Sequence, residues 1–96
     1  SEMCIRDSIN ADFLAPVFFS DELVIETTVI HLGHKSFTML QRAFNKASGV
    51  LKCQCRTVLV GYDNLTKEPI EIPEDYKQAI CDYEGKTLSE LSQPLQ

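Results

Sequence analysis

Three long runs of β-branched and apolar residues, joined by very short turns, constrain this chain more than any other feature of its sequence. The runs cover residues 23–32, 36–45 and 50–62, and the turns between them, 33–34 and 46–49, each contain a glycine. β-branched residues favour strands because they fit a pleated, half-buried surface, and the glycine of the first turn offers the positive φ that a tight hairpin needs. Strands joined by such short turns have to run antiparallel. The sequence therefore predicts a three-stranded meander.

Shorter elements flank the meander. Residues 9–14 form a further predicted strand, which Pro16 stops because proline has no amide donor for pairing. Pro73 and the two acidic residues after it favour a helix over 73–83. Segment 84–96 is expected to be a loose tail or a single helical turn. One face of the predicted helix carries an apolar stripe at i, i+3, i+4 and i+7, made of Tyr76, Ala79, Ile80 and Tyr83.

One face of the expected sheet is apolar and needs a covering layer. With turns of about two and four residues, this face holds Ile25, Val29, Thr38, Leu40, Phe44, Leu51, Cys53, Cys55 and Leu59. The helix over 73–83 offers only about three turns against it. We therefore expect residues 9–83 to form one partial domain whose buried helix lies upstream.

Charge and composition exclude several classes of function. The 96 residues include 9 Lys and Arg against 14 Asp and Glu, a formal net charge of −5, with 44% apolar residues. This balance argues against nucleic acid as a partner, because phosphate binding needs a surplus of cations on one face. No apolar run approaches the roughly 18 residues of a membrane-spanning helix. A small anionic ligand stays possible, since it needs only a few local donors.

The cysteines and histidines do not point to a metal or a cofactor. Cys53 and Cys55 are two positions apart in a predicted strand, which suits neither a disulfide nor a C-x-x-C metal hook. No glycine-rich phosphate loop and no G-x-S-x-G motif is present. We expect no cofactor, no metal site and free thiols in a reducing, cytoplasmic environment.

Four segments in order resemble the hotdog-fold thioesterases of the 4-hydroxybenzoyl-CoA thioesterase-like family. They read INADFLAPVFFSDEL over 9–23, GHKSF over 33–37, LKCQCRTVLVGYD over 51–63 and KEPIEIPE over 67–74. The likeness extends over about residues 8–80. It implies an α+β fold in which an antiparallel sheet wraps a long central helix, and a homodimer or homotetramer in which acyl-CoA thioesters are hydrolysed between subunits.

The same resemblance places the catalytic carboxylate elsewhere. In the family the first strand, the acidic motif and the central helix precede the segment that matches Ile9. We therefore expect a hotdog-like sheet without the first strand and without most or all of the central helix, ending in a short C-terminal helix. No catalytic residue is expected here, and Asp21 resembles a turn aspartate that caps backbone amides. Residues 1–8 are unlike the family and resemble a library-adapter scar, so a non-native start is expected.

The resemblance also selects candidate contacts for coenzyme A. These are Gly33, His34, Lys35 and Ser36 in the first turn, together with Arg56. A cation and a hydroxyl at the hairpin tip could meet a phosphate or pantetheine, and the alternative is a solvated turn. Arg56 could reach an anion, or it could pair with Glu26 or Gln41 on the outer face of the sheet. His31 is expected to be structural.

The predicted function is hydrolysis of acyl-CoA to free acid and coenzyme A by the intact protein, with this segment inactive by itself. One alternative is a hotdog module that binds acyl-CoA or an acyl carrier without catalysis. Another is a hotdog dehydratase, which needs a His/Asp pair. The acyl chain that is preferred cannot be read from the sequence.

Overall fold

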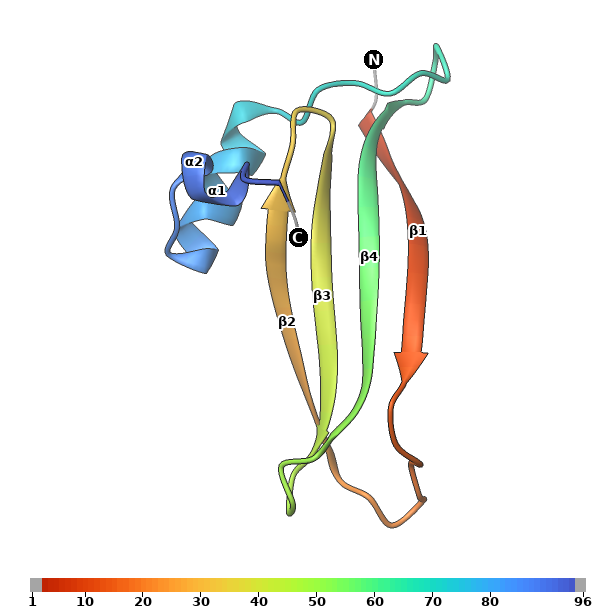
Figure 1. Cartoon of the computed structure of the whole chain (residues 1–96). Coiled ribbons are helices and arrows are strands. Elements are labelled where there is room, and N and C mark those ends of the chain that lie inside the picture. The colour runs from red at the N-terminus through yellow and green to blue at the C-terminus, as the bar shows by residue number, and fades with distance from the viewer. Residues whose placement is uncertain (1–2, 95–96) are drawn as a thin grey trace.

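A computed structural model of the chain describes residues 3–94, which form one antiparallel sheet with two short helices beside it (Figure 1). The strand order is β1-β4-β3-β2. The elements are β1 (Met3–Phe13), β2 (Leu23–Leu32), β3 (Ser36–Asn45), β4 (Leu51–Asp63), α1 (Glu74–Glu84) and α2 (Leu88–Leu91).

The predicted meander is confirmed. β2 pairs with β3 and β3 pairs with β4, both antiparallel, as short turns between long strands require. β1 pairs with the outer side of β4, so β1 and β2 are the two edges of the sheet. Two of the strands, Leu23–Leu32 and Ser36–Asn45, have the bounds that their composition predicts.

The ends of the chain carry more regular structure than the sequence suggests. β1 begins at Met3 rather than at residue 9 and pairs along its length with β4. Segment 84–96, expected to be a loose tail or a single helical turn, contains the one-turn helix α2, which starts with a capping box. The side chain of Thr87 accepts from the backbone N–H of Glu90, and the Glu90 carboxylate accepts from the backbone N–H of Thr87. Leu91 anchors this turn, since it is only 1% exposed.

The predicted inward stripe of β3 is wrong. Cys53 lies opposite Ala43 and Cys55 opposite Gln41, so these residues share a face, whereas Leu40 faces Arg56 on the other side. Phe44 still lies opposite Leu51, as predicted, and the N–H of Asn45 donates to the carbonyl of Val50, so the difference begins at a register shift between Ala43 and Phe44. Since side chains alternate with a period of two, a shift of one residue moves the rest of the stripe to the opposite face.

The covering helix also presents a different face from the predicted one. Tyr76 and Tyr83 are 55% and 79% exposed, while Lys77 and Cys81 are buried. The core cluster therefore contains Leu32, Cys81 and Leu91, with Phe37 and Ile80 packed against it. Gly85 ends α1 in the left-handed conformation, as expected for a C-terminal glycine.

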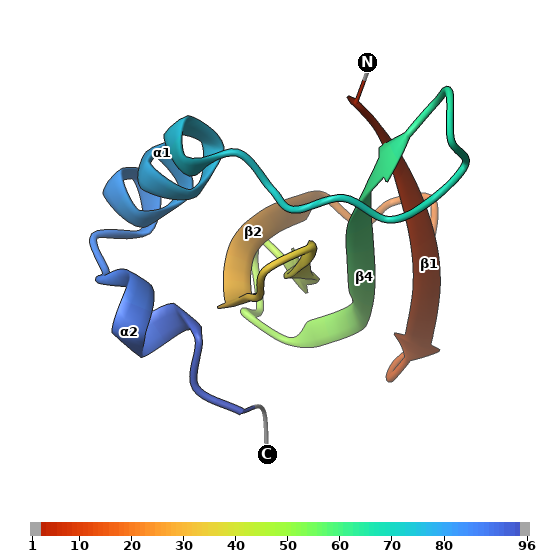
Figure 2. The same cartoon turned by 90° about the horizontal axis from the view of Figure 1, so that it is seen from above.

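The helices lie only at the edge of the sheet that is formed by β2. They contact β2, and Figure 2 shows both of them beside that strand. Within residues 3–94 no long helix crosses the sheet, in agreement with the expected hotdog-like architecture without a central helix. None of the helices described is long and apolar enough to span a membrane.

Candidate functional site

The tip of the β2–β3 hairpin is fixed by backbone hydrogen bonds to two distant segments. The backbone N–H of Ile72 donates to the carbonyl of His34 at 2.8 Å, and the N–H of Gly61 donates to the carbonyl of Lys35 at 2.8 Å. Inside the turn, the N–H of Gly33 donates to the carbonyl of Ser36 at 2.8 Å. The hairpin tip is therefore part of the folded body, although His34 and Lys35 have exposed side chains.

Gly33 does not have the positive φ that the sequence predicts. The glycines with positive φ are Gly49 and Gly85. Gly33 is hydrogen-bonded to Ser36, so it lies before the two residues of the tip, His34 and Lys35, and does not need the left-handed conformation.

Gly61 has no room for a side chain at the point where it supports the hairpin. A Cβ there would lie 2.9 Å from the carbonyl oxygen of Ile70 and 3.0 Å from Cδ1 of Ile72. We expect Gly61→Ala to destabilise the chain by about 1–3 kcal/mol, because backbone has to move. Gly33→Ala is the matched control: its Cβ would meet its nearest neighbour at an ordinary 3.5 Å. Urea unfolding of both variants, made in the longer protein that carries this segment, tests this, and equal stabilities would contradict it.

A cleft of about 250 Å³ lies between this hairpin and the two helices. The hairpin contributes His31, Gly33 and His34, α1 contributes Lys77, and the α2 region contributes Leu88 and Ser92. The structure thus brings the hairpin candidates Gly33 and His34 together with helical residues that the sequence analysis did not select.

Glu71 connects the two sides of the cleft. Its carboxylate lies 3.2 Å from the ammonium of Lys77 and 3.8 Å from Nδ1 of His34. Glu74 adds a second carboxylate 3.6 Å from the same ammonium. The hydrogen bond and the charge of Lys77 hold the pKa of Glu71 below its usual value, so Glu71 is a carboxylate at neutral pH. Lys77 is therefore electrically compensated.

Arg56 is not part of this cleft. It lies opposite Leu40 and Asn10 in the sheet, four positions along β4 from Val60, which faces Ser36. Four residues of a strand span about 13 Å. Arg56 is exposed on the face opposite Cys53 and Cys55, as predicted.

The expected partners of Arg56 are engaged elsewhere. Glu26 forms its ion pair with Arg42, and the amide of Gln41 donates to Thr27. A polar hollow of about 170 Å³ surrounds Arg56 instead, lined by Asn10, Asp12, Leu40, Gln54 and Arg56 itself. Among the side chains that the structure describes, Arg56 makes no ion pair.

Asp21 has the capping role that the resemblance implies. Its carboxylate accepts the backbone N–H of Phe18 at 2.9 Å and an amide hydrogen of Asn45 at 3.2 Å, and it lies 3.7 Å from the ammonium of Lys52. Lys52 in turn donates to the carbonyl of Pro16 at 2.9 Å. Together these contacts shape the loop between β1 and β2.

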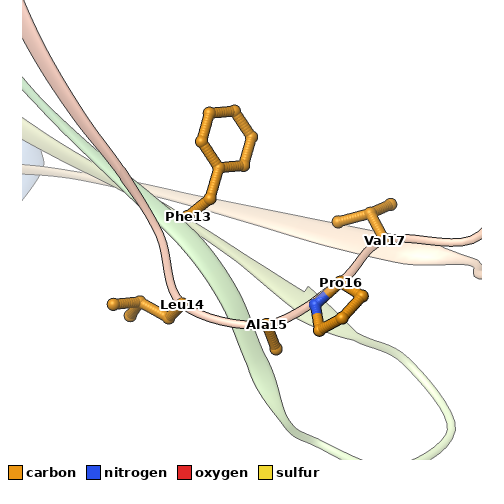
Figure 3. A pocket seen from close by; sticks show the side chains of 5 residues that line it. All are labelled: Phe13, Leu14, Ala15, Pro16 and Val17. Atoms are coloured by element: carbon orange, nitrogen blue, oxygen red, sulfur yellow. The ribbon is translucent and has the colours of Figure 1, made fainter.

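An apolar hollow of about 490 Å³ follows the end of β1, lined by residues 13–17 (Figure 3). In the figure the side chains of Phe13 and Leu14 point to different sides of the loop. No titratable side chain lines this hollow, so it offers surface for an apolar group but no reactive group.

Sequence reasoning missed Lys77 and Ser92, which line the cleft, and Glu71, which contacts Lys77 and His34 beside it. One signal was available: Lys77, Cys81 and Glu84 follow the i, i+4, i+7 spacing of a single helix face. Lys77 and Cys81 are buried on this face of α1, and Glu84 accepts the backbone N–H of Val29 in β2 at 2.8 Å. No spacing rule would have joined Glu71 or Ser92 to that face.

The sequence of residues 2–80 matches the thioesterase-like superfamily. The chain belongs to this superfamily. A search of curated protein sequences finds no match. The superfamily match begins near the first residue of β1, so it includes most of the segment 1–8 that we expected to be unlike the family.

Solved structures of thioesterases share the fold of this superfamily member. The 1,4-dihydroxy-2-naphthoyl-CoA thioesterase from Synechocystis matches with a TM-score of 0.75 and 21% identity, covering 83% of this chain and 59% of that protein. A thioesterase from Thermus thermophilus, complexed with coenzyme A and Zn, matches with a TM-score of 0.74 and 24% identity, covering 88% and 62%.

A third match widens the comparison. A hypothetical protein from Staphylococcus aureus in complex with coenzyme A has a TM-score of 0.78 at 12% identity, covering 98% of this chain and 56% of that protein. This chain thus spans 56–62% of the length of these three proteins. At such identities the comparison shows the fold, and it confirms the hotdog-like sheet that the sequence predicts.

Proposed function

We propose that the intact protein hydrolyses acyl-CoA thioesters to a free acid and coenzyme A. The match of residues 2–80 to the thioesterase-like superfamily carries this proposal. In the reaction water gives up a proton to a base while its oxygen bonds to the acyl carbon, the C–S bond breaks, and the coenzyme A sulfur leaves as the thiolate, which takes up that proton. The catalytic carboxylate is assigned to a part of the protein upstream of these residues, and the enzyme is proposed to be a cytoplasmic homodimer or homotetramer.

Within this scheme the residues of the hairpin bind coenzyme A. Lys35 is an exposed cation at the tip, and the carbonyls of His34 and Lys35 are both held by backbone donors, so the tip is preorganised. A cation carried on such a fixed backbone suits phosphate groups, which accept strong charge-assisted hydrogen bonds. Arg56 stays a separate candidate for an anionic group, since no described side chain compensates it.

Reversing the charge at the hairpin tip tests this role. In the protein that carries this segment, Lys35→Glu should weaken coenzyme A binding by about 1–2 kcal/mol, and by less at high salt. Lys86→Glu is the control, because Lys86 is an exposed cation just after α1 and outside the hairpin. Calorimetry at low and high salt gives the affinities. Equal affinities for wild type and Lys35→Glu at low salt would contradict phosphate binding by Lys35 and would show that the hairpin is a solvated turn.

A second candidate function is binding of acyl-CoA or an acyl carrier without hydrolysis. It is favoured by the cleft, in which Lys77 and Glu71 are paired with each other instead of facing a nucleophile. A thiol-release assay on the intact protein separates the two functions, because only the enzyme consumes the thioester.

A further inference from the structure

Both histidines of the chain line the same cleft. His31 lies near the end of β2 and His34 in the turn that follows. Both line a cleft of about 250 Å³ whose other side includes the buried Lys77 of α1. Leu32 of β2 and Leu88 of α2 line the cleft with apolar side chains. The cleft thus combines imidazole rings, aliphatic surface and charged groups that belong to three different elements.

The charges of the cleft argue against a phosphate as its occupant. The Lys77 ammonium is already shared by Glu71 at 3.2 Å and Glu74 at 3.6 Å. Since Glu71 stays a carboxylate at neutral pH, two negative groups face one lysine, and an added phosphate would meet net repulsion. A neutral ring that donates a hydrogen bond to a carboxylate is better matched to these groups.

The size of the cleft selects a fragment of a ligand. Sites that enclose a whole drug-sized molecule measure about 300–1,000 Å³, so 250 Å³ accommodates one ring system. The hydroxyl of Ser92 is committed to the carbonyls of Leu88 at 2.7 Å and Leu32 at 3.2 Å, so it holds the wall in place. The imidazole of His31 remains for stacking or hydrogen bonding, and that of His34 lies 3.8 Å from the Glu71 carboxylate and offers its ring face.

We propose that this cleft binds the purine base of coenzyme A, with the exocyclic amine directed to the Glu71 carboxylate and the phosphates outside the cleft at the hairpin tip. The inference rests on the proposed function for its ligand and assigns the base to the side of the hairpin that faces α1 and α2. It explains why an exposed cation, Lys35, and a charge-compensated cleft adjoin each other: the first suits the phosphates and the second suits a neutral base.

Filling the cleft tests this assignment. Leu88 is 43% exposed at its rim, and we expect Leu88→Trp to lower the affinity for coenzyme A and for adenosine at least tenfold while leaving pantetheine unchanged. Leu65→Trp is the matched control, since Leu65 is 75% exposed in a turn that does not line the cleft. Calorimetry on the protein that carries this segment, with coenzyme A, adenosine and pantetheine, gives the three affinities.

A second measurement covers the event that Leu88→Trp fails to fold. Adenosine should shift the imidazole NMR signals of His31 and His34 in the wild-type protein that carries this segment, because both residues line the cleft. Coenzyme A binding that is unchanged in folded Leu88→Trp would overturn the base site and leave the thioesterase proposal standing. Adenosine binding without any acyl-CoA hydrolysis by the intact protein would keep the base site and overturn the proposed function. Histidine signals that adenosine does not move would overturn the base site.

Discussion

Residues 1–96 should self-associate or melt without cooperativity, instead of giving a monomer with a sharp thermal transition. The reason is the sheet face that carries Cys53 and Cys55. Away from the helices, this face presents Ile9, Phe13 and Ile25 at 65%, 81% and 60% exposure. In Figures 1 and 2 the helices lie beside β2. They leave the half of the face formed by β1 and β4, which includes Phe13, uncovered. Large exposed apolar patches on a folded chain mark contact surfaces or sites of aggregation.

The size of the expected effect follows from the area. Leaving about 400 Å² of apolar surface in water forgoes on the order of 10 kcal/mol at roughly 25 cal/mol per Å². This is comparable to the entire stability of a small domain, so association that covers the face should be strongly favoured.

Size-exclusion chromatography with light scattering, combined with a thermal melt, measures this directly. Phe13→Ser and Ile25→Ser should reduce the apparent mass, whereas Tyr83→Ser, which removes a side chain 79% exposed on α1, should not. A clean wild-type monomer with a cooperative melt would show that the helices stabilise the sheet sufficiently, and would contradict the expectation.

The strands were predictable because they depend on local composition. The β-branched runs and short turns determine both the existence of β2, β3 and β4 and their antiparallel pairing. The face that each residue occupies was not predictable to the same degree. It depends on the register of strand pairing, and the shift between Ala43 and Phe44 is enough to place Leu40 opposite Arg56, on the other face from Cys53.

The buried face of α1 shows a second limit of sequence reasoning. The spacing of Tyr76, Ile80 and Tyr83 is a sound helical stripe, yet both tyrosines are exposed. The helix instead buries Lys77, whose long aliphatic stem can pack against apolar surface while its ammonium reaches Glu71 and Glu74. A hydropathy pattern counts lysine as polar and therefore selects the wrong side.

The candidate site was predictable only in part. The resemblance to a family pointed to the hairpin, and the structure brings Gly33 and His34 to a cleft while leaving Arg56 about 13 Å along the strand. The contacts that complete the cleft come from residues 71–92, which are about 40–60 positions away from the hairpin in the sequence. Such contacts have no local signature, so Glu71 and Ser92 could not be found from the sequence.

Purified residues 1–96 should release thiol from short, long and aromatic acyl-CoA no faster than buffer does. We assign binding groups to this segment but no general base or nucleophile, and the loss of such a group costs about two to four orders of magnitude in rate. A thiol-release assay on the three substrate classes measures the rate. A longer protein that adds a carboxylate in front of a helix upstream should recover turnover.

Asp12 and Asp21 provide the decisive control for this prediction. Asp21 is already engaged by the N–H of Phe18, the amide of Asn45 and the ammonium of Lys52, and a carboxylate held by these donors is not available to activate water. Asp12 lies in the polar hollow beside Arg56, on the sheet face opposite the one that carries the two strand cysteines. Turnover by the wild-type chain that disappears in Asp12→Asn or Asp21→Asn, with circular dichroism unchanged, would show that the catalytic carboxylate lies within these residues after all.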